Sequence, residues 1–459
     1  MIRELIDPLF VKARVGDVAS YLNKRKRLLD SPPASLVKSA AEAGISIEDL
    51  ANARHRLEKL VVDGDFSRQD GQAAWMPRDA DLGVVQSALE EFYRDQDAEH
   101  KTVAKGFAEQ PDPVSDESLA DAWRPTAARS FMRSMEESDW LGWGLSFVIA
   151  KAIEGVNHKA DFKEQDVPVQ IESNARLVLM GDWGSAVRRA KAVGKQIEEQ
   201  LKPANAGNRE RHLIHLGDVY YAGREFEYQR VLECWPVNES DAEKIGSWCL
   251  NGNHDMFSGG KPLYKFLGDP RFKKQNGCTY FALENKDWLV FGLDSAFESE
   301  GGKGDAGGLA GGQAEWIMKQ IRRAPHKKVM LLSHHQPFSA WENESPLLVE
   351  KLQPILQRDT PVAAWFWGHE HRWAVYEPAH NINYPALIGH GGVPVYASSE
   401  QPNPEREKVR AWDRRSFRHL LESYSYLGFA VLDLDGAEGT VHYIDENGKP
   451  TKPDPDRVA

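Results

Sequence analysis

Five short apolar runs between residues 175 and 371 each end in polar residues, and this pattern limits the possible folds more than any other feature. The runs are "LVLMGDWG" with Asp182, "LIHLGDVYY" with Asp218, "WCLNGNHD" with Asn253 and His254, "VMLLSHHQP" with His334 and His335, and "AAWFWGHEH" with His369 and His371. Short apolar runs that alternate with helical patterns are typical of an α/β sheet. Because separate strands deliver side chains into one crevice at the carboxyl edge of a sheet, we expect these clusters to meet.

Taken singly, each cluster has an ordinary structural explanation. A Gly-Asp pair that ends a strand is more often a turn, Asn-His-Asp can cap a helix, and His-x-His can lie on one face of a strand. Taken together, two aspartates, an asparagine and three or four histidines supply both oxygen and nitrogen ligands. That combination suits a pair of divalent or trivalent first-row metal ions.

The ordered set GD-x-G, GD-x-x-Y, GNHD, S-H-H-x-P and GHEH resembles the motifs of the calcineurin-like metallophosphoesterases, over about residues 175 to 445. The segments "GGQAEWIMKQI" and "ALIGHGG" also resemble features of that family. The resemblance implies an α/β fold, a four-layered α/β/β/α sandwich with the active site at one edge. We expect one sheet to contain the strands that end at Asp182, Asp218 and Asn253, together with "YFALENKDWLVFGLDS". The second would contain those that end at His334 and His369, with "PALIGHGG", "GFAVLDLDG" and "TVHYIDENG".

The resemblance also implies a ligand set for two metal ions, with Asp218 bridging both. The ligands would be Asp182, Asp218, Tyr221 and His371 at the first ion, and Asp218, Asn253, His334 and His369 at the second. Hydroxide bound to the metal would attack phosphorus, so that a phosphate ester is hydrolysed. His254 would donate a hydrogen bond to the phosphoryl group or protonate the leaving oxygen. Asp255 would orient the other ring nitrogen of His254.

One position departs from the commonest family pattern. Gly184 stands where the first motif, Asp-x-His, usually has its histidine. The purple acid phosphatases share Asp-x-Gly and compensate with a tyrosine three residues after the bridging aspartate, which is Tyr221 here, whereas Tyr220 is expected to pack. Because the pKa of tyrosine is about 10, binding as phenolate favours a strongly charged hard ion. We therefore expect iron(III) at the first site, with iron(II), manganese or zinc at the second.

Four further histidines are not assigned as ligands. His335 reaches the cleft only if its strand has ended before it, because neighbouring strand residues face opposite ways. The role of His390 is open, since the family motif explains its neighbouring glycines better than the histidine. His212 and His215 are expected to pack within a strand.

Three functions remain open at this stage. The favoured one is a purple acid phosphatase-like phosphomonoesterase acting on a small phosphorylated substrate. The second is a phosphodiesterase acting on a nucleotide or another diester. The third is a binding scaffold whose chemistry has been lost, which predicts eroded metal ligands.

The first part of the chain has a different texture. Residues 1–170 carry helical periodicity and predict a mostly helical domain, and residues 171–459 form the catalytic domain. The stretch "ISIEDLANARHRLEKLVVDGDFSRQDGQAAWM" resembles a winged helix weakly. The helical domain could roof the cleft, stabilise the core or dock a protein partner, for example through Trp140 to Ala150. The glycine-rich segment Gly301 to Gly312 could cover a site or only connect two elements.

Charge and hydropathy limit the partners. The net charge is −12 and the pI about 5.7, which disfavour broad attraction to nucleic acid or anionic lipid, so no nucleic-acid partner is expected. The apolar segment Trp140 to Ala150 is shorter than the roughly 20 residues that span a bilayer, so no transmembrane segment is expected. The start "MIRELIDPLFVKARVGD" does not resemble a secretory signal, and we expect a cytoplasmic location.

Overall fold

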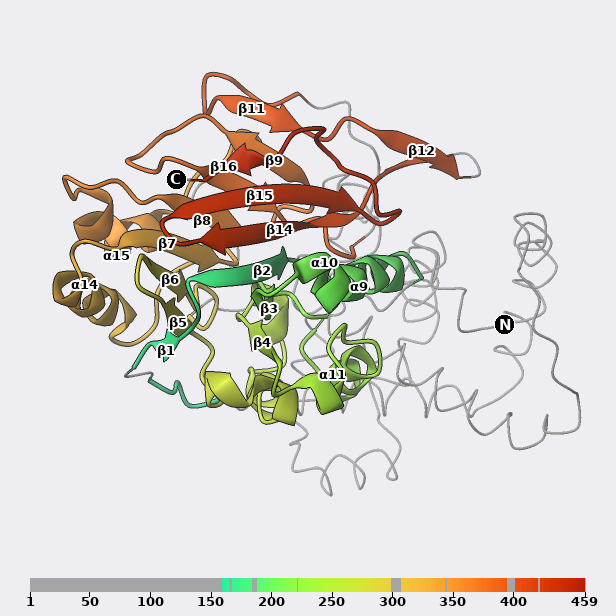
Figure 1. Ribbon diagram of the computed structural model, residues 1–459, viewed down its shortest axis with the longest axis horizontal. Coiled ribbons are helices and arrows are strands. Elements are labelled where there is room, and N and C mark those ends of the chain that lie inside the picture. Colours follow the sequence, from blue (N-terminus) through green and yellow to red (C-terminus); the bar gives the residue numbers. More distant parts are fainter. Residues whose placement is uncertain are drawn as a thin grey trace, which may run out of the picture.

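The computed structural model describes residues 159–164, 167–183, 188–220, 222–298, 307–342, 345–393, 401–419 and 422–458 (Figure 1). The expected helical domain, its winged-helix-like stretch and the segment Trp140 to Ala150 lie outside the described residues. Gly184 and Tyr221 also lie outside them. The boundary at residue 170 stays a prediction.

One sheet has six strands and is mixed. From one edge to the other it contains β16 (Asp456–Arg457), β15 (Glu438–Asp445), β14 (Gly428–Asp435), β2 (Asn174–Met180), β3 (Glu210–His215) and β4 (Ile245–Cys249). The strands β2, β3 and β4 are parallel neighbours, and β14 is antiparallel to β2. Three strands that precede polar clusters therefore end at the same edge.

The other sheet has eight strands and is also mixed. Its order is β1 (Val169–Gln170), β5 (Phe281–Glu284), β6 (Trp288–Gly292), β7 (Lys328–Ser333), β8 (Ala364–Trp367), β10 (Pro385–Ile388), β9 (Trp373–Tyr376) and β11 (Val409–Trp412). The strands β6, β7, β8 and β10 run parallel to one another. A separate antiparallel pair is formed by β12 (Ser416–His419) and β13 (Glu422–Ser425).

The helices and the alternation of side chains complete the architecture. The α-helices are α9 (Arg188–Leu201), α10 (Pro203–Ala206), α11 (Glu225–Leu232), α12 (Asn253–Met256), α13 (Lys261–Phe266), α14 (Gln313–Arg323) and α15 (Pro346–Leu356), and the 3-10 helices are η2 (Glu239–Asp241) and η3 (Pro270–Gln275). On β2, Leu177 and Leu179 join a core shared by both sheets, whereas Val178 and Met180 face the core beneath α9 and α11. A third core lies between the eight-stranded sheet and the helices α14 and α15. Both faces of β2 are buried, which explains its continuous apolar run.

The α/β fold with two mixed sheets is confirmed, but the expected division of strands between the sheets is wrong in two places. The strands β5 and β6 belong to the eight-stranded sheet, where β6 pairs with β7. The strands β14 and β15 belong to the six-stranded sheet, where β14 pairs with β2. Because the two sheets share one apolar core, a buried strand has the same sequence pattern in either of them.

A short segment before β1 lies against the catalytic region. Phe162 stacks on Tyr280 with ring centroids 5.6 Å apart and meets Phe297 edge-on at 5.0 Å. The backbone N–H of Ala160 donates to the carbonyl of Gly259 at 2.7 Å. We call residues 159–164 the strap. In the part of the chain that the structure describes, no helix has the length and apolar character needed to cross a membrane.

Candidate metal centre

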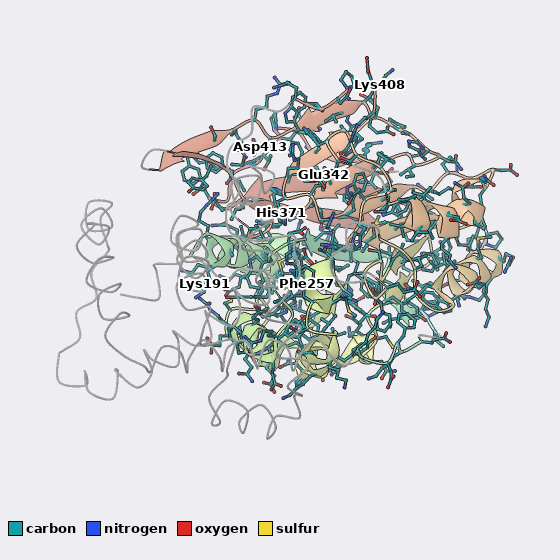
Figure 2. All side chains as sticks on the ribbon, turned by 180° about the vertical axis from the view of Figure 1, so that it is seen from behind. Lys191, Phe257, Glu342, His371, Lys408 and Asp413 are labelled. Atoms are coloured by element: carbon teal, nitrogen blue, oxygen red, sulfur yellow. The ribbon has the colours of Figure 1, made fainter. Side chains whose placement is uncertain are left out.

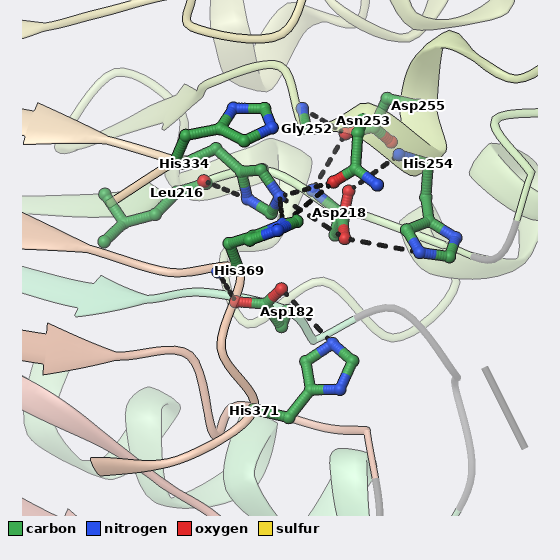
Figure 3. A network of polar contacts seen from close by, with 12 residues as sticks. Asp182, Leu216, Asp218, Gly252, Asn253, His254, Asp255, His334, His369 and His371 are labelled. Carbon is green, nitrogen blue, oxygen red and sulfur yellow. Dashed lines mark hydrogen bonds and ion pairs between the residues drawn. The ribbon is translucent and has the colours of Figure 1, made fainter. Parts of the chain in front are cut away.

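The loops after β2, β3 and β4 carry the expected oxygen ligands. Asp182 and Asp218 lie beyond the ends of β2 and β3, and Asn253 begins α12, shortly after β4. All three side chains are buried. Their parallel strands place them together at one edge, as Figure 3 shows.

Two of these ligands have an unusual backbone conformation. Asp182 has φ 53° and Asp218 has φ 56°, in the left-handed region that non-glycine residues seldom adopt. A Cβ at the neighbouring Gly252 would lie 2.2 Å from Oδ1 of Asp218, so only glycine admits the carboxylate there. Strained conformations of this kind persist where the surroundings fix them, and they cluster at functional sites.

Asp255 fixes the turn that carries Asp218. Its Oδ2 accepts from the backbone N–H of Asp218 and of Gly252, each at 2.9 Å, and its Oδ1 accepts from the N–H of Val219 at 3.1 Å. Burial raises the pKa of Asp255 to about 7, against these hydrogen bonds, which lower it. The carboxylate thus contacts the backbone of the Asp218 turn and of Gly252, and the expected orientation of His254 by Asp255 stays a prediction.

The expected histidine ligands follow strands of the eight-stranded sheet. The strand β7 ends at Ser333, so His334 and His335 both lie beyond it, and His369 and His371 follow β8. His334 Nδ1 lies 3.1 Å from the carbonyl oxygen of Leu216, which turns Nε2 toward Asn253 Oδ1 at 2.9 Å. His369 has φ 70°, and its N–H donates to Asp182 Oδ2 at 2.9 Å.

His334 Nε2, Asn253 Oδ1 and His369 Nδ1 lie together in an arrangement that suits binding of a cation better than hydrogen bonding among themselves. Because a carbonyl only accepts, His334 Nδ1 donates to Leu216 and a neutral ring carries a lone pair on Nε2. Burial, together with the neighbouring histidines, lowers the pKa of His334 well below its usual value, so the ring is neutral. That lone pair faces Asn253 Oδ1 at 2.9 Å and His369 Nδ1 at 3.2 Å. A metal ion satisfies such a cluster of acceptors.

Two buried groups of ligand atoms result. Within each group the atoms lie within 4.8 Å of one another. The groups are His334, His335 and His369, and Asp182, Asp218 and His371. His334 Nε2 also lies 3.4 Å from Asp218 Oδ2, so Asp218 touches both groups. The arrangement fits a dinuclear centre.

His254 lies beside the bridging carboxylate. Its Nε2 is 3.9 Å from Asp218 Oδ2, and its backbone N–H donates to Asp218 Oδ1 at 3.0 Å. The ring packs on Phe257 with centroids 4.4 Å apart, and it is almost completely buried. The structure therefore places His254 beside the centre, and its catalytic role stays a prediction.

His335 and its partner Ser295 extend the site beyond the sequence assignment. His335 Nδ1 lies 3.0 Å from Ser295 Oγ, and the two rings of His335 and His369 have centroids 4.8 Å apart. Ser295 follows β6 in "GLDS", another polar cluster that ends an apolar run, and that signal was available in the sequence. A Cβ at Gly307 would lie 2.5 Å from the His335 side chain, so the described end of the glycine-rich segment lies against the site.

The structure also locates His212, His215, Tyr220 and His390, all of which are buried. His212 and His215 are buried on β3, and Tyr220 is buried with its hydroxyl accepting from Arg230 at 2.6 Å, so all three pack as expected. His215 Nδ1 also accepts from the N–H of Gly217 at 3.1 Å and so shapes the Asp218 turn. His390 is buried against Gly428, and burial lowers its pKa to about 4.

Comparison with known proteins agrees with this geometry. Residues 175–373 match the family model of the calcineurin-like phosphoesterases. Tartrate-resistant acid phosphatase type 5 of Oryctolagus cuniculus is 25% identical over 303 residues, which are 60% of this chain and 88% of the relative. The human protein of the same name is 24% identical over 302 residues, with the same coverage. A probable glycerophosphodiester phosphodiesterase GpdQ of Arcobacter nitrofigilis is 25% identical over 165 residues, 35% of this chain and 56% of the relative.

The matched range includes both ligand groups from Asp182 to His371. The five ordered motifs, their convergence in space and these matches lead to one assignment. Residues 175–373 are those of a calcineurin-like metallophosphoesterase, and this part of the chain is distantly homologous to the tartrate-resistant, or purple, acid phosphatases.

Proposed function

We propose that this protein is a dinuclear metal-dependent phosphomonoesterase of the purple acid phosphatase type, acting on a small phosphorylated substrate. The observation that carries the proposal is the meeting of the two buried ligand groups at Asp218. Carboxylates from one sheet and imidazoles from the other form a mixed ligand set, which suits first-row transition ions.

The ligand assignment divides the residues between two ions. Asp182, Tyr221 and His371 would hold the first ion, Asn253, His334 and His369 would hold the second, and Asp218 would bridge them. When bound, such a pair of ions supplies an activated water nucleophile and neutralises charge on the phosphoryl oxygens. A tyrosinate ligand favours iron(III) at the first site, with iron(II), manganese or zinc at the second.

His254 would serve the leaving group. It lies beside Asp218, and its buried ring is held by Phe257 on one side. As the imidazolium it can donate a hydrogen bond to the phosphoryl group or pass a proton from Nε2 to the departing oxygen. Its place on the turn of α12, directly after Asn253, keeps it close to any phosphate held at the centre.

A phosphodiesterase is the second candidate. It is supported by the similarity to the Arcobacter nitrofigilis protein that is named as a probable diesterase. Monoester preference needs extra positive donors around a dianion. The scaffold alternative predicts eroded ligands, whereas Asp182, Asp218, Asn253, His334, His369 and His371 are all present and converge. Loss of chemistry is therefore disfavoured.

The decisive experiment uses the full chain with measured metal content. Turnover of a chromogenic phosphate monoester is compared with turnover of the matching diester, after loading with iron or with manganese. The proposal expects faster monoester hydrolysis and greatest activity with iron present. Preferential diester hydrolysis would support the second candidate, and a protein that binds two ions yet turns over neither substrate would support the scaffold.

The tyrosinate ligand has its own optical test. Iron-loaded protein should show a visible tyrosinate-to-iron(III) charge-transfer band that Tyr221→Phe abolishes. Tyr220→Phe is the matched control, because the hydroxyl of Tyr220 accepts a hydrogen bond from Arg230. This variant should leave the band unchanged. A colourless manganese or zinc protein as isolated would count against iron at the first site.

The N-terminal region, expected to be helical, is proposed to roof the cleft, to stabilise the core or to dock a protein partner. A deletion that ends at residue 158 keeps the strap and β1 in place. An insoluble product favours the stabilising role, and an active enzyme with an altered substrate range favours the roof. Cytoplasmic location stays a prediction.

A further inference from the structure

Tyr228 lies outside the ligand-bearing loops but is bonded to the residue that fixes one of them. It belongs to α11, it is buried, and its ring packs on Phe266 with centroids 5.0 Å apart. Its hydroxyl donates to Asp255 Oδ1 at 2.9 Å. A phenylalanine ring could fill the same space in this core, so packing alone does not require the hydroxyl.

Asp255 joins two loops that carry metal ligands. Its Oδ2 accepts from the N–H of Asp218, after β3, and from the N–H of Gly252, directly before Asn253. Its Oδ1 accepts from Val219 and from Tyr228. One carboxylate thus ties the bridging aspartate to the loop of the neighbouring ligand, and Tyr228 ties that carboxylate to α11.

Asp218 has a left-handed backbone conformation, so its position depends on the hydrogen bonds to Asp255. A residue at φ 56° relaxes unless its surroundings hold it, and two of the hydrogen bonds that hold the turn end on Asp255. Without the Tyr228 hydroxyl, Oδ1 keeps the Val219 N–H at 3.1 Å but loses its side-chain donor. The carboxylate can then rotate, and the Asp218 turn can shift with it.

We infer that Tyr228 is a positioning residue for the dinuclear centre, acting through Asp255 on the bridging Asp218. The inference rests on the proposed function for its effect on turnover, and it rests on the family ligand set for its effect on metal retention. It assigns to α11 a part in metal binding although none of the ligands described above lies on that helix.

The test is Tyr228→Phe in the full-length, metal-loaded protein. Outer partners of ligands typically contribute 10-fold to 100-fold in metal affinity or activity. We therefore expect extraction of metal by a chelator to be about 10-fold to 100-fold faster, and kcat to fall by a similar factor with KM little changed. Tyr384→Phe is the matched control. The buried hydroxyl of Tyr384, directly before β10, donates to Asp456 of β16 at 2.8 Å. This variant should lower the melting temperature comparably but leave metal release unchanged.

The route through Asp255 is tested by a double-mutant cycle. If Tyr228 acts through Asp255, then Tyr228→Phe adds little to metal release in an Asp255→Asn background. Additive effects, or equal metal release from wild type and Tyr228→Phe, would overturn the inference. If the wild type binds metal but hydrolyses no phosphate ester, the proposed function fails, while the release rates still test the inference.

Discussion

The two sheets make different contributions to the centre. The six-stranded sheet presents the candidate oxygen ligands Asp182, Asp218 and Asn253, and the eight-stranded sheet presents the imidazoles of His334, His369 and His371. Figure 2 labels His371 in the view from behind. Neither sheet alone holds a complete set, so the centre depends on how the two sheets pack through their shared core.

The two sides are also held in place differently. On the oxygen side the backbone is strained and is braced by hydrogen bonds to Asp255. On the histidine side, His334 is oriented by the carbonyl of Leu216, and His335 lies at hydrogen-bond distance from Ser295 Oγ. Disturbing the oxygen side should therefore affect both ions, whereas removing one histidine should affect mainly one.

The largest effect is expected at the point where the two sides meet. Asp218→Ala removes the carboxylate that touches both groups, so both ions should be lost. The loss of activity should exceed the roughly 10²-fold to 10⁴-fold loss expected when a general acid is removed. Metal analysis and steady-state kinetics measure this. Asp241→Ala on η2, away from the ligand loops, should change neither. Two retained ions in Asp218→Ala would refute the bridge.

The next comparison concerns the histidine side alone. His371 lies with Asp182, its Nε2 3.5 Å from Oδ1, and His369 lies with His334 and Asn253. Each of His371→Ala and His369→Ala should leave about one ion per chain, in different sites. Metal stoichiometry, with the visible band as a reporter of the first site, distinguishes them. Loss of both ions from each variant would mean that the two sites are not separable.

A smaller effect, confined to the chemical step, is expected at His254. His254→Gln should keep both ions, because the metal ligands are unchanged, and should lower kcat by about 10²-fold to 10⁴-fold. The loss should shrink for substrates with acidic leaving groups, which depart without a proton. A series of aryl phosphates measures this dependence. An equal loss for all leaving groups would assign His254 to binding the phosphoryl group instead.

The strap should affect stability and not the centre. Phe162 is half-buried among Tyr280 and Phe297, so Phe162→Ala should reduce the free energy of unfolding by about 2 kcal/mol. Thermal and denaturant unfolding measure the change. Metal content should equal that of the wild type. A loss of metal would show that the strap also supports the loops of the site.

The sequence predicts those parts of the fold and site that depend on neighbouring residues in the chain, and not those that depend on distant ones. Asp182, Asp218, Asn253, His334, His369 and His371 each follow an apolar strand, so their convergence at one edge could be read from the sequence. The sheet membership of β14 could not, because its pairing with β2 spans most of the catalytic region. Ser295, Tyr228 and the contacts of Asp255 act through partners distant in sequence, from 27 residues for Tyr228 and Asp255 to 40 for Ser295 and His335. The cluster "GLDS" marks Ser295 at the end of a strand, but no short motif encodes these pairings.

The smallest effect concerns a buried charge on the histidine side that lies on β5, outside the ligand loops. Glu284 accepts hydrogen bonds from Arg323 and Lys327, each at 2.6 Å, and from Gln170 at 2.9 Å; although burial alone raises its pKa, these partners lower it to about 2. Because the folded pKa lies below the unfolded value of about 4.3, the ionised group stabilises the fold above that value and loses this contribution as the pH falls toward 2. Glu284→Gln should therefore destabilise the protein at pH 7, and its difference from wild type should diminish as the pH falls from about 4 toward 2. Denaturant unfolding across this range measures the difference, and metal content at pH 7 should not change. A difference that is constant with pH would mean that Glu284 acts by shape and hydrogen bonding and not by its charge.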